Sequence, residues 1–196
     1  TLDLEQFDDL CDQMLFNTAL PTDFESSKSS FVLEPGDSDS AVMETSIGQG
    51  KTLVTPFHMA LIASAIANDG VLMKPYVIDR ITDAEGEVVE QYEPAEYKTL
   101  LSESDASVLQ EYMRYVVEEG TATKLKSDSY EAAGKTGSAE FSSSSDATHS
   151  WFVGYAHSGE EPDIAVAVIV EHSGVGSEYA VPIAKQIFDA YYTWEN

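Results

Sequence analysis

The sequence has few basic residues and almost no cysteine. Lys and Arg total 10 against 35 Asp and Glu among 196 residues, so the formal net charge is −25. A surface this acidic repels phosphate groups, which argues against binding to nucleic acid and to anionic lipid. The single cysteine, Cys11, excludes an internal disulfide framework and any Cys-rich zinc module.

Long apolar runs and metal-ligand spacings are also missing. The uninterrupted apolar stretch Ile164–Val170 is far too short to span a bilayer. No motif for phosphate, flavin, nicotinamide or haem is present, and no pair of histidines has the H-E-x-x-H spacing of a zinc site. We therefore expect no metal and no cofactor. Four histidines are placed at ordinary surface or strand positions: His58, His149, His157 and His172.

Apolar spacing along the chain predicts helices and strands in separate blocks. Helical spacing covers residues 4–15, 57–68, 103–119 and 183–192. Strand patterns cover residues 131–141, 150–156 and 164–171, and a hairpin of residues 71–82 and 87–92 that turns at 83–86. Residues 21–40 have the composition of a long surface loop, mobile at 26–30. The order predicts an α+β fold with an antiparallel sheet flanked by helices.

Two helix starts carry specific signals. Thr55 precedes Pro56, the arrangement of an N-cap followed by proline at the first helical position. Ser102 and Asp105 resemble a capping box with Asp in place of Glu.

The densest chemical motif is Gly134-Lys135-Thr136-Gly137-Ser138, at the start of a predicted strand. A phosphate-binding P-loop would need Gly where Ser129 stands, so that interpretation fails. An isolated Lys-Thr-Gly could also be a tight turn with a solvated lysine. The remaining interpretation is the Lys-Thr-Gly element of the serine penicillin-recognising enzymes, in which a strand edge presents an ammonium and a hydroxyl to a substrate carboxylate.

Further blocks favour the third interpretation because they occur in a consistent order around it. These blocks are Ser46–Gly50, Val54–Ala60, Ile66–Gly70, Gly120–Ala122, Ala133–Ala139 and Trp151–Tyr155. Together they resemble class B penicillin-binding proteins from about Ala41 to the C-terminus. The resemblance implies a partial penicillin-binding-protein/β-lactamase-like transpeptidase fold.

The resemblance also implies a reaction and its ligands. A serine attacks the D-Ala-D-Ala carbonyl of a peptidoglycan stem peptide, and β-lactam antibiotics acylate the same serine. Lys135 and Thr136 would bind the terminal carboxylate, Gly137 would keep the strand surface flat, and the Ser138 N–H would supply one oxyanion-hole donor. The parent protein would be anchored on the outer face of the bacterial cytoplasmic membrane.

Two further motifs of the family are absent. None of the eight lysines has serine three residues before it, so S-x-x-K is missing, and none of the three asparagines has serine two residues before it, so S-x-N is missing. Thr1 is not a natural start residue. We therefore expect residues 1–196 to be the C-terminal portion of a single transpeptidase domain. This portion would contain no catalytic residue, be inactive alone and be prone to self-association.

Other interpretations stay open. The chain could be a non-catalytic sensor or scaffold module with the same fold, or part of a β-lactamase. Sequence upstream of Thr1 would separate an enzyme from such a module. Ser142–Ser145 with Asp146 could form a flexible connection or a lid over the substrate groove.

Overall fold

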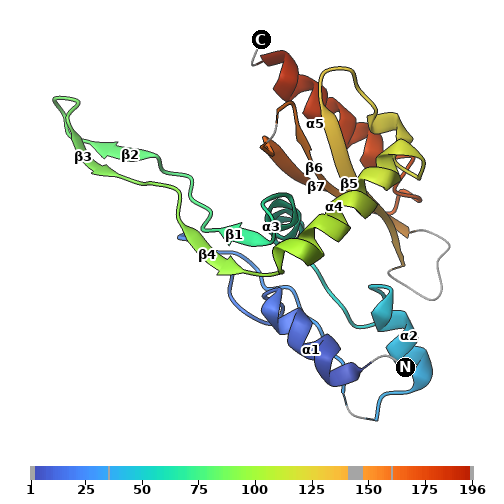
Figure 1. Cartoon of the computed structure of the whole chain (residues 1–196). Coiled ribbons are helices and arrows are strands. Elements are labelled where there is room, and N and C mark those ends of the chain that lie inside the picture. Colours follow the sequence, from blue (N-terminus) through green and yellow to red (C-terminus); the bar gives the residue numbers. More distant parts are fainter. Residues whose placement is uncertain (1–2, 35, 141–147, 160, 195–196) are drawn as a thin grey trace.

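A three-stranded antiparallel sheet organises the second half of the chain. The computed structural model describes residues 3–34, 36–140, 148–159 and 161–194. β5 (Glu131–Glu140), β6 (Thr148–His157) and β7 (Ile164–Val170) lie in the order β5-β6-β7 (Figure 1). No described strand pairs with the outer side of β5, so β5 forms an edge of this sheet. The predicted α+β class and all three strands are confirmed.

Helices cover both faces of the sheet. α5 (Ala180–Trp194) packs on one face, where Phe188 joins Phe152 in a core cluster. α3 (Pro56–Ala67) and α4 (Glu103–Glu118) cover the other face, where a second cluster contains Tyr155. Because successive strand residues point to opposite faces, Phe152 and Tyr155 belong to different cores. All three helices match the predicted positions to within a few residues.

The first part of the chain packs against α3. α1 (Leu4–Gln13) begins after Asp3, whose side chain accepts hydrogen bonds from the N–H groups of Glu5 and Gln6. The chain after α1 contributes Leu15 and Leu20 to a cluster with Leu61 of α3. The N-terminal segment is therefore joined to the body through an apolar contact of its own.

Both predicted N-caps are present. The Thr55 hydroxyl accepts a hydrogen bond from the His58 N–H at 3.1 Å, and the Ser102 hydroxyl accepts one from the Asp105 N–H at 3.1 Å. Each cap satisfies a backbone donor that the first turn of a helix leaves without a partner.

The predicted mobile loop is partly fixed, and it ends in a helix that the sequence did not reveal. α2 (Asp39–Ser46) begins within the predicted loop. Ser29 is only 1% exposed, and its hydroxyl accepts a hydrogen bond from the Thr55 N–H at 3.0 Å. Ser30 forms an isolated β-bridge with Leu53. The prediction of mobility at 26–30 was therefore wrong for Ser29 and Ser30.

The predicted hairpin is divided into two small sheets. β1 (Val71–Met73) pairs with β4 (Glu96–Thr99), and β2 (Arg80–Thr82) pairs with β3 (Val88–Gln91). Pro75 lies between β1 and β2 and has no N–H to donate to a ladder, which explains the break. The turn at residues 83–86 is confirmed. We call residues 80–91 the arm, because they project from the body (Figure 1).

His58 departs from its predicted position. It lies on α3 and is fully buried, so the expectation of a surface or strand position was wrong. Its Nε2–H donates to the carbonyl oxygen of Met14 at 2.7 Å, and Nδ1 is buried without a partner among the described residues. Burial lowers the pKa of this imidazole.

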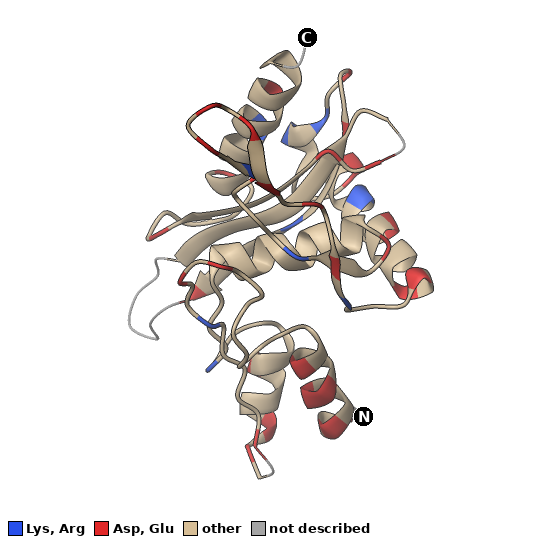
Figure 2. Ribbon diagram, turned by 90° about the vertical axis from the view of Figure 1, so that its left-hand side faces the viewer, with Lys and Arg blue, Asp and Glu red and all other residues tan. Residues whose placement is uncertain are grey.

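Acidic residues are distributed over helices and loops, with Lys and Arg much sparser (Figure 2). Such a distribution is typical of a solvated acidic surface. Within the described ranges, no helix combines the length and apolar character needed to cross a bilayer.

Candidate functional site

The four residues predicted to bind the substrate lie together in the middle of β5. Lys135, Thr136, Gly137 and Ser138 contribute to the wall of a cavity of about 630 Å³. Lys135 stands opposite Val153 in the register, and Gly137 stands opposite Trp151. Cross-strand partners share a face of the sheet, so β5 and β6 form one continuous side of the cavity.

A glycine-rich turn forms another side. Gly48 and Gly50 have φ values of +78° and +72°, in the left-handed region that favours glycine. Gln49 stands between them, and its side-chain N–H donates to the Ser138 carbonyl oxygen at 3.3 Å. The turn after α2 is thereby attached to the Lys-Thr-Gly strand.

The segment after α4 reaches the same strand. Thr121 lies between α4 and the short 3₁₀ helix η1 (Thr123–Leu125). The hydroxyls of Thr121 and Thr136 are 2.6 Å apart and share a hydrogen bond. Three sequence blocks that are far apart in the chain therefore meet at β5: Ser46–Gly50, Gly120–Ala122 and Ala133–Ala139.

Gly176 is a contributor that the sequence analysis did not single out. A Cβ atom at Gly176 would lie 2.5 Å from the Trp151 carbonyl oxygen and 2.7 Å from that of Gly137. Its N–H donates to the Ser138 hydroxyl at 3.4 Å. The backbone after β7 thus packs directly on the Lys-Thr-Gly strand, and only glycine allows this approach.

The polar groups at the cavity include one cation with no acidic partner among the described residues. The Lys135 ammonium donates to the Thr136 carbonyl oxygen at 2.5 Å, and no ion pair joins it to a described carboxylate. Thr52 also lines the cavity, and its buried hydroxyl has no partner in the described ranges. An ammonium in this state can receive an anionic ligand without first breaking a salt bridge.

His149, expected at an ordinary surface or strand position, lies on β6. His149 lines the cavity, and its Nδ1 accepts a hydrogen bond from the His172 N–H at 3.2 Å. The predicted connection or lid at Ser142–Ser145 lies outside the described residues.

Comparison with known proteins identifies the family. The sequence model of the family described as "Penicillin binding protein transpeptidase domain" matches residues 1–189 of this chain. The chain therefore belongs to the penicillin-binding-protein transpeptidase family. Peptidoglycan D,D-transpeptidase PbpA of Mycolicibacterium smegmatis is 31% identical over 148 residues, which is 72% of this chain and 30% of that protein. Penicillin-binding protein 3 of Bacillus subtilis is 30% identical over 183 residues, covering 89% of this chain and 26% of its own length.

Solved structures show the same fold. Penicillin-binding protein A of M. tuberculosis, as its imipenem acyl-enzyme complex, superposes with a TM-score of 0.83 at 26% identity, over 95% of this chain and 42% of that one. Penicillin-binding protein 2B of Streptococcus pneumoniae strain R6 superposes with a TM-score of 0.80 at 26% identity, over 97% of this chain and 33% of that one. The chain thus spans less than half the length of these relatives.

Proposed function

We propose that this chain is the C-terminal portion of a D,D-transpeptidase domain that cross-links peptidoglycan stem peptides, and that β5 binds the terminal carboxylate of the substrate. The observation that carries the proposal is the meeting of three distant sequence blocks at Lys135–Ser138, on the wall of one cavity. The alternative of a sensor or scaffold gains no support from the relatives, several of which are named as peptidoglycan D,D-transpeptidases.

The chemistry of β5 suits a peptide that ends in D-Ala-D-Ala. The Lys135 ammonium and the Thr136 hydroxyl would bind the carboxylate, or its equivalent in a β-lactam, through charge-assisted hydrogen bonds. The stem peptide would add as a strand along the open edge of β5. The Ser138 N–H would donate one hydrogen bond to the developing oxyanion.

The covalent step requires groups outside these 196 residues. A serine in an S-x-x-K segment would attack the penultimate D-Ala carbonyl, the terminal D-Ala would leave as an amine, and a second stem peptide's amine would take the acyl group. No lysine of this chain has serine three residues before it, so the parent protein would supply that segment. The parent would act on the outer face of the cytoplasmic membrane, held there by an anchor outside this chain.

The test is Lys135→Ala in the longer parent protein. We expect acylation by a fluorescent penicillin to slow roughly tenfold or more, because a charge-assisted hydrogen bond is lost in the transition state. The reaction is stopped at a series of times, and the fluorescence of the labelled band on a denaturing gel gives the acylation rate constant. Thermal unfolding shows whether the variant folds.

Lys126→Ala is the matched control, because Lys126 is an exposed lysine that does not line the cavity. It should acylate at the parental rate. An unchanged rate constant in Lys135→Ala would remove the assigned role of this lysine.

A further inference from the structure

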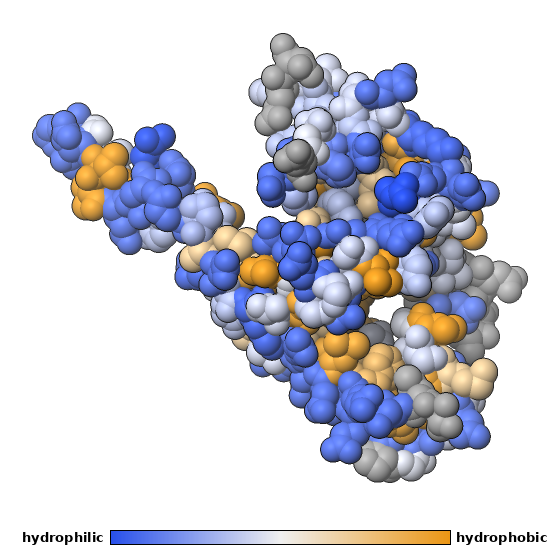
Figure 3. Space-filling model, viewed as in Figure 1, coloured by the Kyte–Doolittle hydropathy of each residue, from blue (hydrophilic) through white to orange (hydrophobic). Residues whose placement is uncertain are grey.

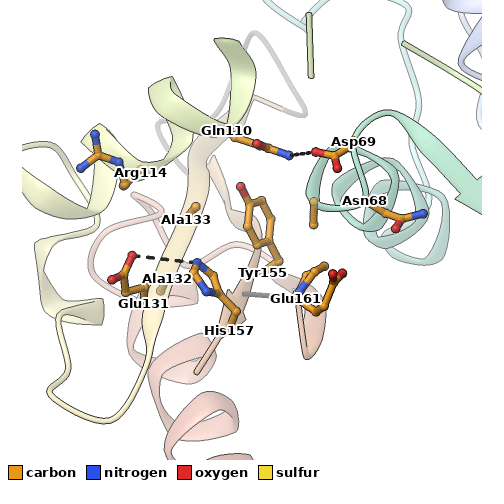
Figure 4. Close-up of a pocket in the computed structure, with 12 residues that line it drawn as sticks. Asn68, Asp69, Gln110, Arg114, Glu131, Ala132, Ala133, Tyr155, His157 and Glu161 are labelled. Carbon is orange, nitrogen blue, oxygen red and sulfur yellow. Dashed lines mark hydrogen bonds and ion pairs between the residues drawn. The ribbon is translucent and has the colours of Figure 1, made fainter. Parts of the chain in front are cut away.

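A second cavity lies at the other end of the same face of the sheet. It measures about 350 Å³ and lies between the C-terminal end of α3, the middle of α4, the start of β5 and the end of β6 (Figure 4). Ala133 lines it, and Lys135 lies two residues further along β5 at the other cavity. None of its polar residues belongs to the Lys-Thr-Gly site.

The rim of this cavity is fixed by hydrogen bonds between two helices. The Gln110 side-chain N–H donates to the Ile66 carbonyl oxygen at 2.8 Å and to the Asp69 carboxylate at 3.1 Å. Asp69 follows α3 with a φ of +51°, so the chain turns sharply there. The Asp69 carboxylate is therefore held at the cavity mouth (Figure 4).

Tyr155 places a polar group inside the cavity. Its side chain is only 6% exposed, and its hydroxyl points into the space bordered by Gln110 and Asp69 (Figure 4). Within the described ranges, no hydrogen bond is made by this hydroxyl. A tyrosine hydroxyl can both donate and accept a hydrogen bond, so this group is available to a ligand that enters the cavity. Burial and the charge of Asp69 raise the pKa of Tyr155 to about 12, which keeps the phenol protonated.

Hydrogen-bond acceptors and negative charge dominate the lining. Glu131 and Glu161 line the cavity together with Asp69. Among the described lining residues, Arg114 is the only Lys or Arg, and it forms an ion pair with Glu118 one turn along α4. His157 also lines the cavity: its Nδ1 donates to the Gly159 carbonyl oxygen at 2.7 Å, and its Nε2 lies 4.0 Å from the Glu131 carboxylate (Figure 4).

These features favour an organic cation over a metal ion. The described residues contain no group of three or more side chains arranged to hold a metal. An anion would be repelled by three carboxylates, and the arginine in the lining is already paired with Glu118. A primary ammonium, by contrast, has three N–H donors that match separate acceptors.

We propose that this cavity binds a small aliphatic primary ammonium, which donates to the Tyr155 hydroxyl and to the Asp69 carboxylate. The cavity volume is at the lower end of the range for small-molecule sites, about 300–1,000 Å³. The proposal is independent of the function assigned to β5.

The experiment titrates the 196-residue chain with 1,4-diaminobutane, followed by calorimetry and by NMR. We expect saturable binding. Tyr155→Phe removes one hydroxyl, and Asp69→Asn removes one charge but keeps an oxygen that can accept from Gln110. Each variant should weaken binding about tenfold, since a hydrogen bond to a charged group is lost. Thermal unfolding verifies that both variants fold.

Matched controls separate a site from general attraction to an acidic protein. Tyr112→Phe and Asp9→Asn change exposed residues away from the cavity and should leave binding unchanged. Tetramethylammonium carries the same charge as one ammonium group but no N–H donor, and magnesium chloride tests a metal ion. The proposal would be overturned if the unsubstituted 196-residue chain showed no saturable binding. Equal binding of tetramethylammonium or magnesium, or unchanged affinity in Tyr155→Phe and Asp69→Asn, would also overturn it.

Discussion

His58 couples the stability of the chain to pH. It is fully buried beside the ring of Phe16, 5.0 Å between centroids, and burial lowers its pKa. The unfolded chain therefore takes up a proton at His58 more readily than the folded chain. Stability is full above the ordinary histidine pKa of about 6.5 and is lost as the pH falls below it towards the lower folded-state pKa.

The corresponding variant is His58→Gln, which removes the titration and keeps a side-chain N–H donor. We expect the free energy of unfolding of the unsubstituted 196-residue chain to fall between about pH 7.5 and about pH 5.5. The variant should show a smaller fall. Urea unfolding at both pH values measures the difference. His157→Gln, at a half-exposed position, serves as the control. If His58→Gln and the unsubstituted chain lost stability equally as the pH falls, His58 would not be the group that couples stability to pH.

Single residues also mark the limit of sequence reasoning. Lys135–Ser138 were recognisable because they are contiguous and have a distinctive motif. Tyr155, Asp69 and Gln110 were not recognisable as a group, because they come from a strand, a helix end and another helix and meet only in the folded chain. Gly176 was missed for the same reason, since its contact with Gly137 joins two distant segments.

At the scale of elements, the sequence predicted those helices and strands whose own residues carry apolar spacing, a capping residue or a distinctive motif. α3 and α4 have both apolar spacing and a capping residue, β6 and β7 carry apolar runs, and β5 contains the Lys-Thr-Gly motif. α2 has only eight residues in a segment rich in Ser and Asp, a composition that is typical of loops. The pairing of β1 with β4 joins strands that are distant in the sequence, and no local pattern specifies it.

The cap of α4 gives a test at this scale. The Ser102 hydroxyl accepts from the Asp105 N–H and donates to the Asp105 carboxylate at 2.6 Å. Ser102→Ala should lower the free energy of unfolding by about 1 kcal/mol, the usual contribution of an N-cap. Ser107→Ala, at an exposed position inside the helix, should cost nothing, because alanine is a better helix former. If Ser102→Ala and the unsubstituted chain had equal free energies of unfolding, the cap would not stabilise the fold.

At the scale of the whole molecule, apolar side chains at the large cavity remain open to solvent. Ile47 and Leu53 line that cavity and are 76% and 69% exposed, and Met43, one turn before Ile47, is 69% exposed. Exposed apolar groups that lie together favour association. The net charge of −25 opposes it through repulsion that salt screens.

We therefore expect the 196-residue chain to self-associate, and more strongly at high salt than at low salt. Sedimentation velocity over a range of concentrations measures this. The double variant Ile47→Ser and Leu53→Ser should shift the equilibrium to monomer, whereas Val77→Ser and Val89→Ser, near and on the arm, should not. A monomer at both salt concentrations, or a loss of association only in the second pair, would contradict the prediction.

The whole chain should also fail to react covalently with penicillin. No serine stands three residues before a lysine, so the nucleophile that the family motif requires is not among these residues. Incubation with a fluorescent penicillin and denaturing electrophoresis should give no labelled band, while the longer parent protein is labelled. A band that survives denaturation would identify a nucleophile within the 196 residues.

The arm affects how the molecule rotates. All seven residues of β2 and β3 are exposed, and apolar side chains on the arm face solvent (Figures 1 and 3). A rod attached to one side of a body lengthens one principal axis of the diffusion tensor. Rotation about that axis is therefore faster than end-over-end tumbling. The ¹⁵N relaxation rates of equally rigid amides in the sheet and in the helices should then differ according to the angle that each N–H bond makes with the arm.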